Sequence, residues 1–329
     1  MSLLPAADDK LAIEAFASAF DGYGTTAAGE SLEGRARAKR RETWEDLRAE
    51  LFLMSRAERF NAGPPDLGEQ DRLSRLYREL LPLFMLHGGT PTPLSAHEQM
   101  LRQSYEANVD EEAFGKAWGL KSPQTWWTSL KLNRASSEAA LPTTVLSRDN
   151  LRAQLESEAD AERAALLVLA WGEMQPRNAR RFFAADKGLW VDVVVDMRLG
   201  SMSPTSAYAE FARRKVAGLG PAYFTKLIYF LHPGQQGVGF IMDQWTATSI
   251  NLLFGCDVVK MAKVSTTRTK TAVSDRNDGK RYDLFNRLIE QIARSWSASP
   301  EHVEMTLFGR GGKAVDLWRR HVLKSLDLV

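Results

Sequence analysis

The chain has 329 residues, of which 44% are hydrophobic and 26% are charged, a balance typical of soluble globular proteins. Its net charge is only +2, so the bulk charge does not predict a nucleic-acid partner, and any such role must depend on local basic patches. The single cysteine, Cys256, excludes an internal disulfide and a cysteine-rich zinc or iron–sulfur site.

No apolar run approaches the length of a membrane span, and the N-terminal residues lack a basic segment followed by a long apolar one. We therefore expect a cytoplasmic monomer that does not bind a membrane. The five histidines are scattered and show no metal-binding spacing. We expect no metal site and no cofactor.

The first part of the chain shows the spacing of amphipathic helices, with apolar residues three and four positions apart. Helices are expected over 5–20, 70–86, 95–107 and 111–118. A polar linker with a proline follows at 133–144. We place a domain boundary there, between an N-terminal helical region of unknown role, 1–145, and a C-terminal domain, 146–329.

The C-terminal domain begins with a helix that Ser147 or Asp149 can cap. The next helix, Asp160 to Trp171, is apolar on nearly all sides, which predicts burial within a helical bundle. The segment Trp190 to Val195 is β-prone, and because its surroundings are helical we interpret it as an extended connector or helix edge. Further helices are expected over 206–216, 244–254, 282–296, 301–308 and 314–326. The predicted fold is all-α, with two helical lobes and a cleft between them.

A glycine turn joins two of these helices. Gly218 and Gly220 flank Leu219, and Pro221 follows at the position where a helix tolerates proline best. Glycines allow a backbone to approach a ligand closely, and the first amides of a helix have no partner within that helix. The Gly218–Pro221 turn is therefore a suitable binding site for a phosphate. A short apolar run later in the chain leads to Asp243, at the expected start of the next helix.

The Gly218-Leu219-Gly220-Pro221 turn, the apolar helix and the later Phe240-Ile241-Met242-Asp243 resemble the helix–hairpin–helix DNA glycosylases, and most closely the 8-oxoguanine glycosylase branch. The resemblance covers roughly the C-terminal half. It implies that the hairpin grips the DNA backbone and that Asp243 serves the glycosidic-bond chemistry. The spacing to Asp243 is slightly longer than usual.

One departure concerns the lysine that bifunctional members carry just after the second glycine. Ala222 stands at this position, so the resemblance implies a monofunctional enzyme without lyase activity. Lys226 lies one helical turn later on the same face and is a displaced candidate. A lysine in the middle of a helix usually belongs to a solvated face, and this interpretation is favoured for Lys226.

Asp243 is the main catalytic candidate. Its carboxylate could stabilise the positive charge that develops on the sugar during hydrolysis of an N-glycosidic bond, and could activate the attacking water. Aspartate is also a favoured helix N-cap, which is compatible with catalysis because a cap fixes the side chain.

Two groups of basic residues are candidates for DNA contacts besides the glycine turn. The first is Arg177, Arg180 and Arg181, at a helix start where the dipole disfavours cations. The second is the segment 257–281, in which seven basic residues stand against three acids. Its DNA-contact candidates are Lys260, Lys263, Arg268 and Lys270.

Trp171, Gln244 and Trp245 are candidates for contacts to an extruded base, although tryptophans more often belong to the core.

Three functions fit these residues. The first is a DNA glycosylase that excises a damaged or modified base from double-stranded DNA in base-excision repair. The second, which shares this chemistry, is an antiviral glycosylase acting on hypermodified phage bases. The third is a non-enzymatic DNA-binding protein that uses the hairpin as a backbone clamp. Asp243 favours an enzyme, since a carboxylate facing DNA would repel the phosphates.

Overall fold

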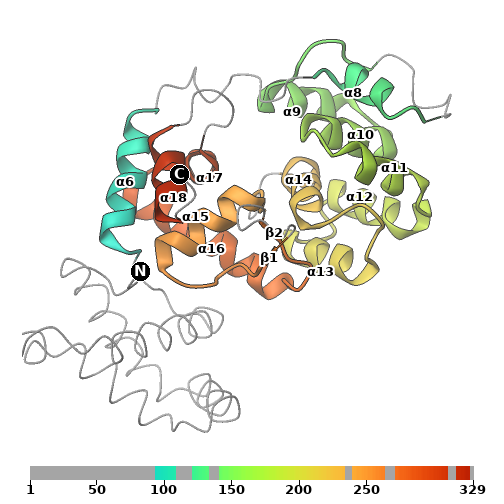
Figure 1. The fold of residues 1–329 in the computed structure, drawn as a ribbon. Helices are drawn as coiled ribbons and strands as arrows, with labels where there is room; N and C mark the ends of the chain where they lie inside the picture. The colour runs from blue at the N-terminus through green and yellow to red at the C-terminus, as the bar shows by residue number, and fades with distance from the viewer. Residues whose placement is uncertain are drawn as a thin grey trace, which may run out of the picture. The chain divides into compact units, whose positions relative to one another are not determined.

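The computed structural model describes residues 93–108, 121–132, 141–233, 239–263, 271–309 and 316–326 (Figure 1). The described residues are mostly helical, with one two-stranded sheet, so the prediction of an all-α fold is confirmed. The helices expected over 5–20, 70–86 and 111–118 lie outside the described residues. No helix in the described ranges is long and apolar enough to cross a membrane.

The helices in chain order are α6 (Ser95–Glu106), α8 (Pro123–Ser129), α9 (Arg148–Ser157), α10 (Ala161–Trp171), α11 (Pro176–Ala184), the 3-10 turn η3 (Lys187–Leu189), α12 (Val191–Arg198), α13 (Pro204–Arg214), α14 (Pro221–Leu231), α15 (Gln244–Phe254), α16 (Gly279–Trp296), α17 (Pro300–Phe308) and α18 (Leu317–Ser325). The strands are β1 (Met261–Lys263) and β2 (Thr271–Val273).

The described residues belong to two compact units. One contains those up to 104, residues 248–258 and those from 316 onward, and the other contains those within 105–247 and 259–309. All the residues of the candidate site belong to the second unit. The boundary expected between 145 and 146 stays a prediction.

Helix α10 forms the centre of the second unit. Every residue from Ala164 to Trp171 is buried, and the helix packs against α8, α9, α12 and α14 (Figure 1). Asp160 caps it, since its Oδ1 accepts hydrogen bonds from the amides of Glu162 and Arg163. The prediction of a buried central helix is confirmed.

Of the two interpretations of the β-prone segment Trp190 to Val195, an extended connector or a helix edge, the extended connector is wrong, because Val191 to Val195 are helical. The segment forms most of α12, in which Val193, Val194 and Met197 are buried. The helix packs against α10, α13 and α14. Tertiary packing of this apolar face therefore outweighs the β-preference of the valines.

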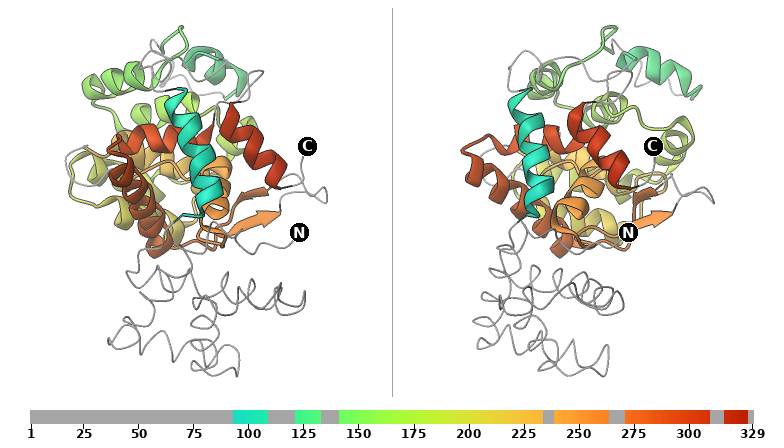
Figure 2. Two further views of the ribbon diagram at one scale, coloured as in Figure 1. Left: turned by 90° about the vertical axis from the view of Figure 1, so that its left-hand side faces the viewer. Right: turned by 60° about the vertical axis from the view of Figure 1, so that its left-hand side comes forward.

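Helices α13 and α14 are joined by the Gly218–Pro221 turn, and β2 also packs against α14. Strands β1 and β2 pair antiparallel, with Met261 opposite Val273, and appear as the two short arrows in Figure 2. The long helix α16 packs on both α13 and α17.

Candidate active site

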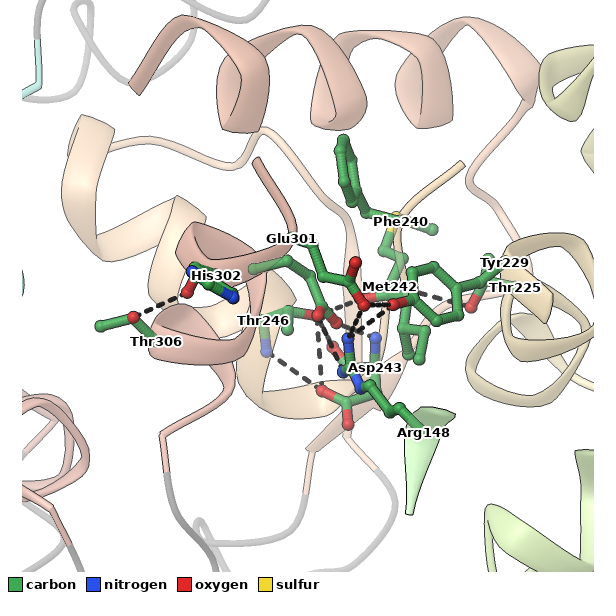
Figure 3. Close-up of polar contacts among 12 residues, drawn as sticks. Arg148, Thr225, Tyr229, Phe240, Met242, Asp243, Thr246, Glu301, His302 and Thr306 are labelled. Atoms are coloured by element: carbon green, nitrogen blue, oxygen red, sulfur yellow. Dashed lines mark hydrogen bonds and ion pairs between the residues drawn. The ribbon is translucent and has the colours of Figure 1, made fainter. Parts of the chain in front are cut away.

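The segment before α15 is fixed by hydrogen bonds to two helices (Figure 3). The Phe240 amide donates to Asn286 Oδ1 of α16 at 3.0 Å, and the Met242 amide donates to Thr225 Oγ1 of α14 at 3.1 Å. Because these groups are buried, their hydrogen bonds are costly to lose. The start of α15, and with it Asp243, is therefore held in place by both helices.

Asp243 is the N-cap of α15, as the sequence predicts. Its Oδ1 accepts hydrogen bonds from the amides of Trp245 at 2.8 Å and Thr246 at 3.0 Å. In return, the Asp243 amide donates to Thr246 Oγ1 at 3.0 Å, as in a capping box. No described residue donates a hydrogen bond to the second oxygen, Oδ2. The cap thus orients the half-buried carboxylate and leaves one oxygen available.

Lys226 is buried, with only 8% of its surface exposed, so the expectation of a solvated lysine is wrong. Its Nζ donates a hydrogen bond to the carbonyl of Ala222 at 2.9 Å and lies 5.8 Å from the centre of the Tyr223 ring. Burial lowers the pKa of the Lys226 amine, while the carboxylates of Asp243 and Glu304 act in the opposite direction. Lys226 and Asp243 are therefore close enough to interact electrostatically.

Gly172, the C-cap of α10, provides the space that the Lys226 side chain occupies. A Cβ atom at Gly172 would lie 2.7 Å from Lys226 Cδ, closer than any normal contact. Any larger residue at this position would displace the lysine stem. The lysine position therefore depends on a glycine 54 positions earlier in the sequence, which helical spacing could not reveal.

A group of charged residues that the sequence analysis missed surrounds Asp243 and Lys226. Arg148 and Arg152 extend from α9, and Glu301 and Glu304 extend from α17. Figure 3 shows Tyr229 of α14 in contact with both Arg148 and Glu301. The Tyr229 hydroxyl accepts a hydrogen bond from Arg148 at 3.0 Å and donates one to Glu301. The only sequence signals were the i, i+4 and i, i+3 spacings of these pairs, which are common on solvated helices.

The Gly218–Pro221 turn has the predicted form, but its amides are not all available. The Leu219 amide donates to the carbonyl of Val216 at 3.0 Å within the turn. Gly218 has a φ of +83°, and its backbone approaches that of Asn178 in α11. The glycine at 218 therefore has a packing role of its own. Contacts of the turn to DNA stay a prediction.

The Gly218–Pro221 turn packs against α11, the helix that carries the three arginines predicted to contact DNA. Arg177, Arg180 and Arg181 are all exposed, and Arg180 Nε donates to the carbonyl of Leu130 at 2.9 Å. Lys263, at the end of β1, and Lys260, directly before β1, are exposed. Arg268 and Lys270 lie outside the described residues.

The three predicted base-contact residues differ in their surroundings. Trp171 is buried, with Phe230 packed edge-on at 4.7 Å and the guanidinium of Arg148 over its ring at 5.9 Å. A base could stack on this ring only if Arg148 moved. Gln244 and Trp245 are half-buried at the start of α15, directly after Asp243. Their contact with a base stays a prediction.

The described residues contain no group of three or more metal-ligating side chains.

The geometry describes an all-α protein in which a helix-capping aspartate interacts with a buried lysine, and the helix of that lysine begins at a glycine turn that joins it to the preceding helix. Residues 109–308 match the family described as "Putative 8-oxoguanine DNA glycosylase OGG-like protein". This match spans more than half of the chain, so the chain belongs to this family, as the resemblance implies. Comparisons with curated proteins and with solved structures found no match.

Proposed function

We propose that the chain is a DNA glycosylase that hydrolyses the N-glycosidic bond of a damaged or modified base in double-stranded DNA. The observation that carries this proposal is the hydrogen bonding of the Asp243 carboxylate. One of its oxygens holds the cap of α15, while no described residue donates a hydrogen bond to the other. A carboxylate needed only as a cap would not require the polar surroundings that Lys226, Arg148 and Glu304 provide. The family supports a DNA substrate.

In the proposed reaction, the bond between C1′ and the base nitrogen breaks, and its electron pair leaves with the base. The positive charge that develops on the sugar is stabilised by the Asp243 carboxylate, whose effect is strengthened in a partly buried site. Water then adds to C1′ and gives its proton to Asp243, while the departing base nitrogen takes up a proton from solvent. The products are a free base and an abasic site.

The substrate proposal is a modified base, with 8-oxoguanine suggested by the family and hypermodified phage bases as the alternative. The test is to incubate the protein with duplexes that carry different modified bases, and with modified phage DNA, and to measure abasic sites. Release of 8-oxoguanine supports a repair role, whereas release from phage DNA alone supports antiviral defence.

One observation favours a second candidate, a glycosylase that also cleaves the strand. Lys226 is buried beside Asp243, and burial lowers the pKa of its amine, which favours the neutral, nucleophilic form. Such an amine could attack C1′ and displace the base, form a Schiff base as the bond between C1′ and the ring oxygen opens, and assist elimination of the 3′ phosphate. The alanine at position 222 therefore does not decide between a purely hydrolytic glycosylase and one that also cleaves the strand.

Borohydride trapping separates these candidates. For hydrolysis by Asp243, we expect no covalent protein–DNA adduct, and the abasic strand should break only on alkali or heat. A borohydride-reduced adduct that forms with the wild type and disappears in Lys226→Met would establish the lyase instead. Lys324→Met, at an exposed lysine of α18, is the control for loss of one positive charge.

DNA affinity is expected to be mainly electrostatic and to decrease with salt concentration. In Lys260→Glu and Lys263→Glu, the slope of log K against log salt should decrease by about one unit for each phosphate that is no longer neutralised by a lysine. Binding to an unmodified duplex measured from low to moderate salt gives this slope, with Lys324→Glu as a control. An unchanged slope in both variants would remove β1 from the DNA-binding surface.

A further inference from the structure

Glu304 of α17 is a fully buried carboxyl, with 0% of its surface exposed. Its Oε2 forms an ion pair with Arg148 Nη2 at 2.8 Å, but neither carboxyl oxygen has a hydrogen-bond partner among the described residues. Burial of a carboxylate oxygen without a donor is costly, since the charged form loses its hydration. Glu304 is therefore a poor candidate for a purely structural ion pair.

Arg148 cannot easily turn to satisfy both oxygens of Glu304, because it is held elsewhere. Its Nη1 donates to the Tyr229 hydroxyl at 3.0 Å, and its guanidinium lies over the Tyr229 ring at 4.9 Å and the Trp171 ring at 5.9 Å. These contacts fix the plane of the guanidinium. The position of Arg148 thus leaves one side of the Glu304 carboxyl without compensation.

Titratable groups from several helices interact electrostatically with Glu304. Arg148 extends from α9, and Asp243 stands at the start of α15. Helix α14 contributes Lys226 and Tyr229, α16 contributes Tyr282, and α17 contributes Glu301. Because Glu304 acts on both Asp243 and Lys226, a change in its charge alters the field at the two catalytic candidates.

We propose that Glu304 is a positioning residue of this site, whose fully buried and incompletely paired carboxyl sets, through its charge, the field around Asp243 and Lys226. This inference rests on the proposed glycosylase function. When Glu304 is ionised, it neutralises Arg148, and the site favours the positive sugar. When Glu304 is neutral, Arg148 keeps only the Glu301 carboxylate, 3.7 Å away, as a counter-charge, and the remaining positive charge opposes that of the sugar.

The pKa of the Glu304 carboxyl allows its charge to change near neutral pH. Burial raises the pKa of the Glu304 carboxyl to about 7, although Arg148 acts to lower it, and the carboxylates of Asp243 and Glu301 raise it further. Near neutral pH both forms of Glu304 are therefore populated. Glu301 differs: burial opposes its ionisation, but Tyr229 and Arg152 lower the pKa of its carboxyl overall.

The pH dependence of base release under single-turnover conditions tests the proposal. We expect the wild-type rate to rise about tenfold with an apparent pKa near 7, because ionisation of Glu304 makes the site more negative. Glu304→Gln should lose this rise and keep the low-pH rate throughout. Glu304→Asp should retain a titration at a shifted pH. Glu301→Gln, on the same helix, should retain the transition near 7.

A second measurement does not depend on activity. Because the folded pKa of Glu304 is raised, the stability it contributes is present below its unfolded pKa and is lost as pH rises through about 7. Unfolding free energies should therefore show the wild type losing stability relative to Glu304→Gln over that range. An identical pH dependence in both proteins, or a rate transition near 7 that survives in Glu304→Gln, would overturn the proposal. If the wild type releases no base at any pH, the proposed function fails, while the unfolding measurement still decides whether Glu304 titrates.

Discussion

Replacing Asp243 by asparagine is expected to lower the rate of base release by about a hundredfold or more. The substitution removes the negative charge that would stabilise the sugar cation and the base that would activate water. It keeps the size of the side chain and an oxygen that can accept the hydrogen bonds of the Trp245 and Thr246 amides. Fold and DNA affinity should therefore remain, since asparagine caps helices about as well as aspartate. Single-turnover kinetics and a salt-dependent binding assay measure the two properties separately.

Asp160→Asn is the matched control for this experiment. Asp160 caps α10 through the same pair of hydrogen bonds, from the amides of Glu162 and Arg163. If Asp243 acts only as a cap, both variants should behave alike. Base release at the wild-type rate in Asp243→Asn would remove Asp243 from the reaction.

The Gly218→Ala substitution should destabilise the protein by about 2–4 kcal/mol. Gly218 has a φ of +83°, which costs an alanine about 1–2 kcal/mol, and the new Cβ would lie 2.2 Å from the carbonyl oxygen of Asn178. That oxygen belongs to the backbone of α11, so relief requires the turn and the helix to separate. The midpoint of urea unfolding measures the effect.

Gly220→Ala is the control for Gly218→Ala within the same turn. Gly220 has a φ of −84°, and the nearest atom to an added Cβ is Asp275 Oδ1 at 3.8 Å, an ordinary contact. This variant should lose less than about 1 kcal/mol, as expected for alanine at an N-cap. Equal losses in the two variants would contradict the packing role assigned to Gly218.

Features that depend on neighbours in the sequence were predictable. The burial of α10 follows from apolar residues on all sides of the helix, and Asp160 lies directly before its first turn. The α15 helix ends where Gly255 follows, with a φ of +63°. The cap at Asp243 is equally local, because its hydrogen-bond donors are two and three residues away.

Features that depend on distant contacts were not predictable. Lys226 is buried because Gly172 leaves room for its stem, and spacing within α14 suggested a solvated lysine. Arg148 and Glu304 meet across 156 positions of sequence. Each also lies on a helix with other charged residues, where a solvated face is the usual explanation. The helical α12 was missed for the same reason, since its buried valines lie on a helix that packs against other helices.

The most direct test of the central claim is the detection of a released base. Wild-type protein, Asp243→Asn and Asp160→Asn are incubated with duplexes carrying modified bases, 8-oxoguanine among them, and with modified phage DNA. Free bases are then identified by mass spectrometry and abasic sites are counted. Stoichiometric release of one class of base by the wild type and by Asp160→Asn, but not by Asp243→Asn, is the predicted result. Tight binding of these DNAs without release of any base would contradict it and identify a non-enzymatic DNA-binding protein.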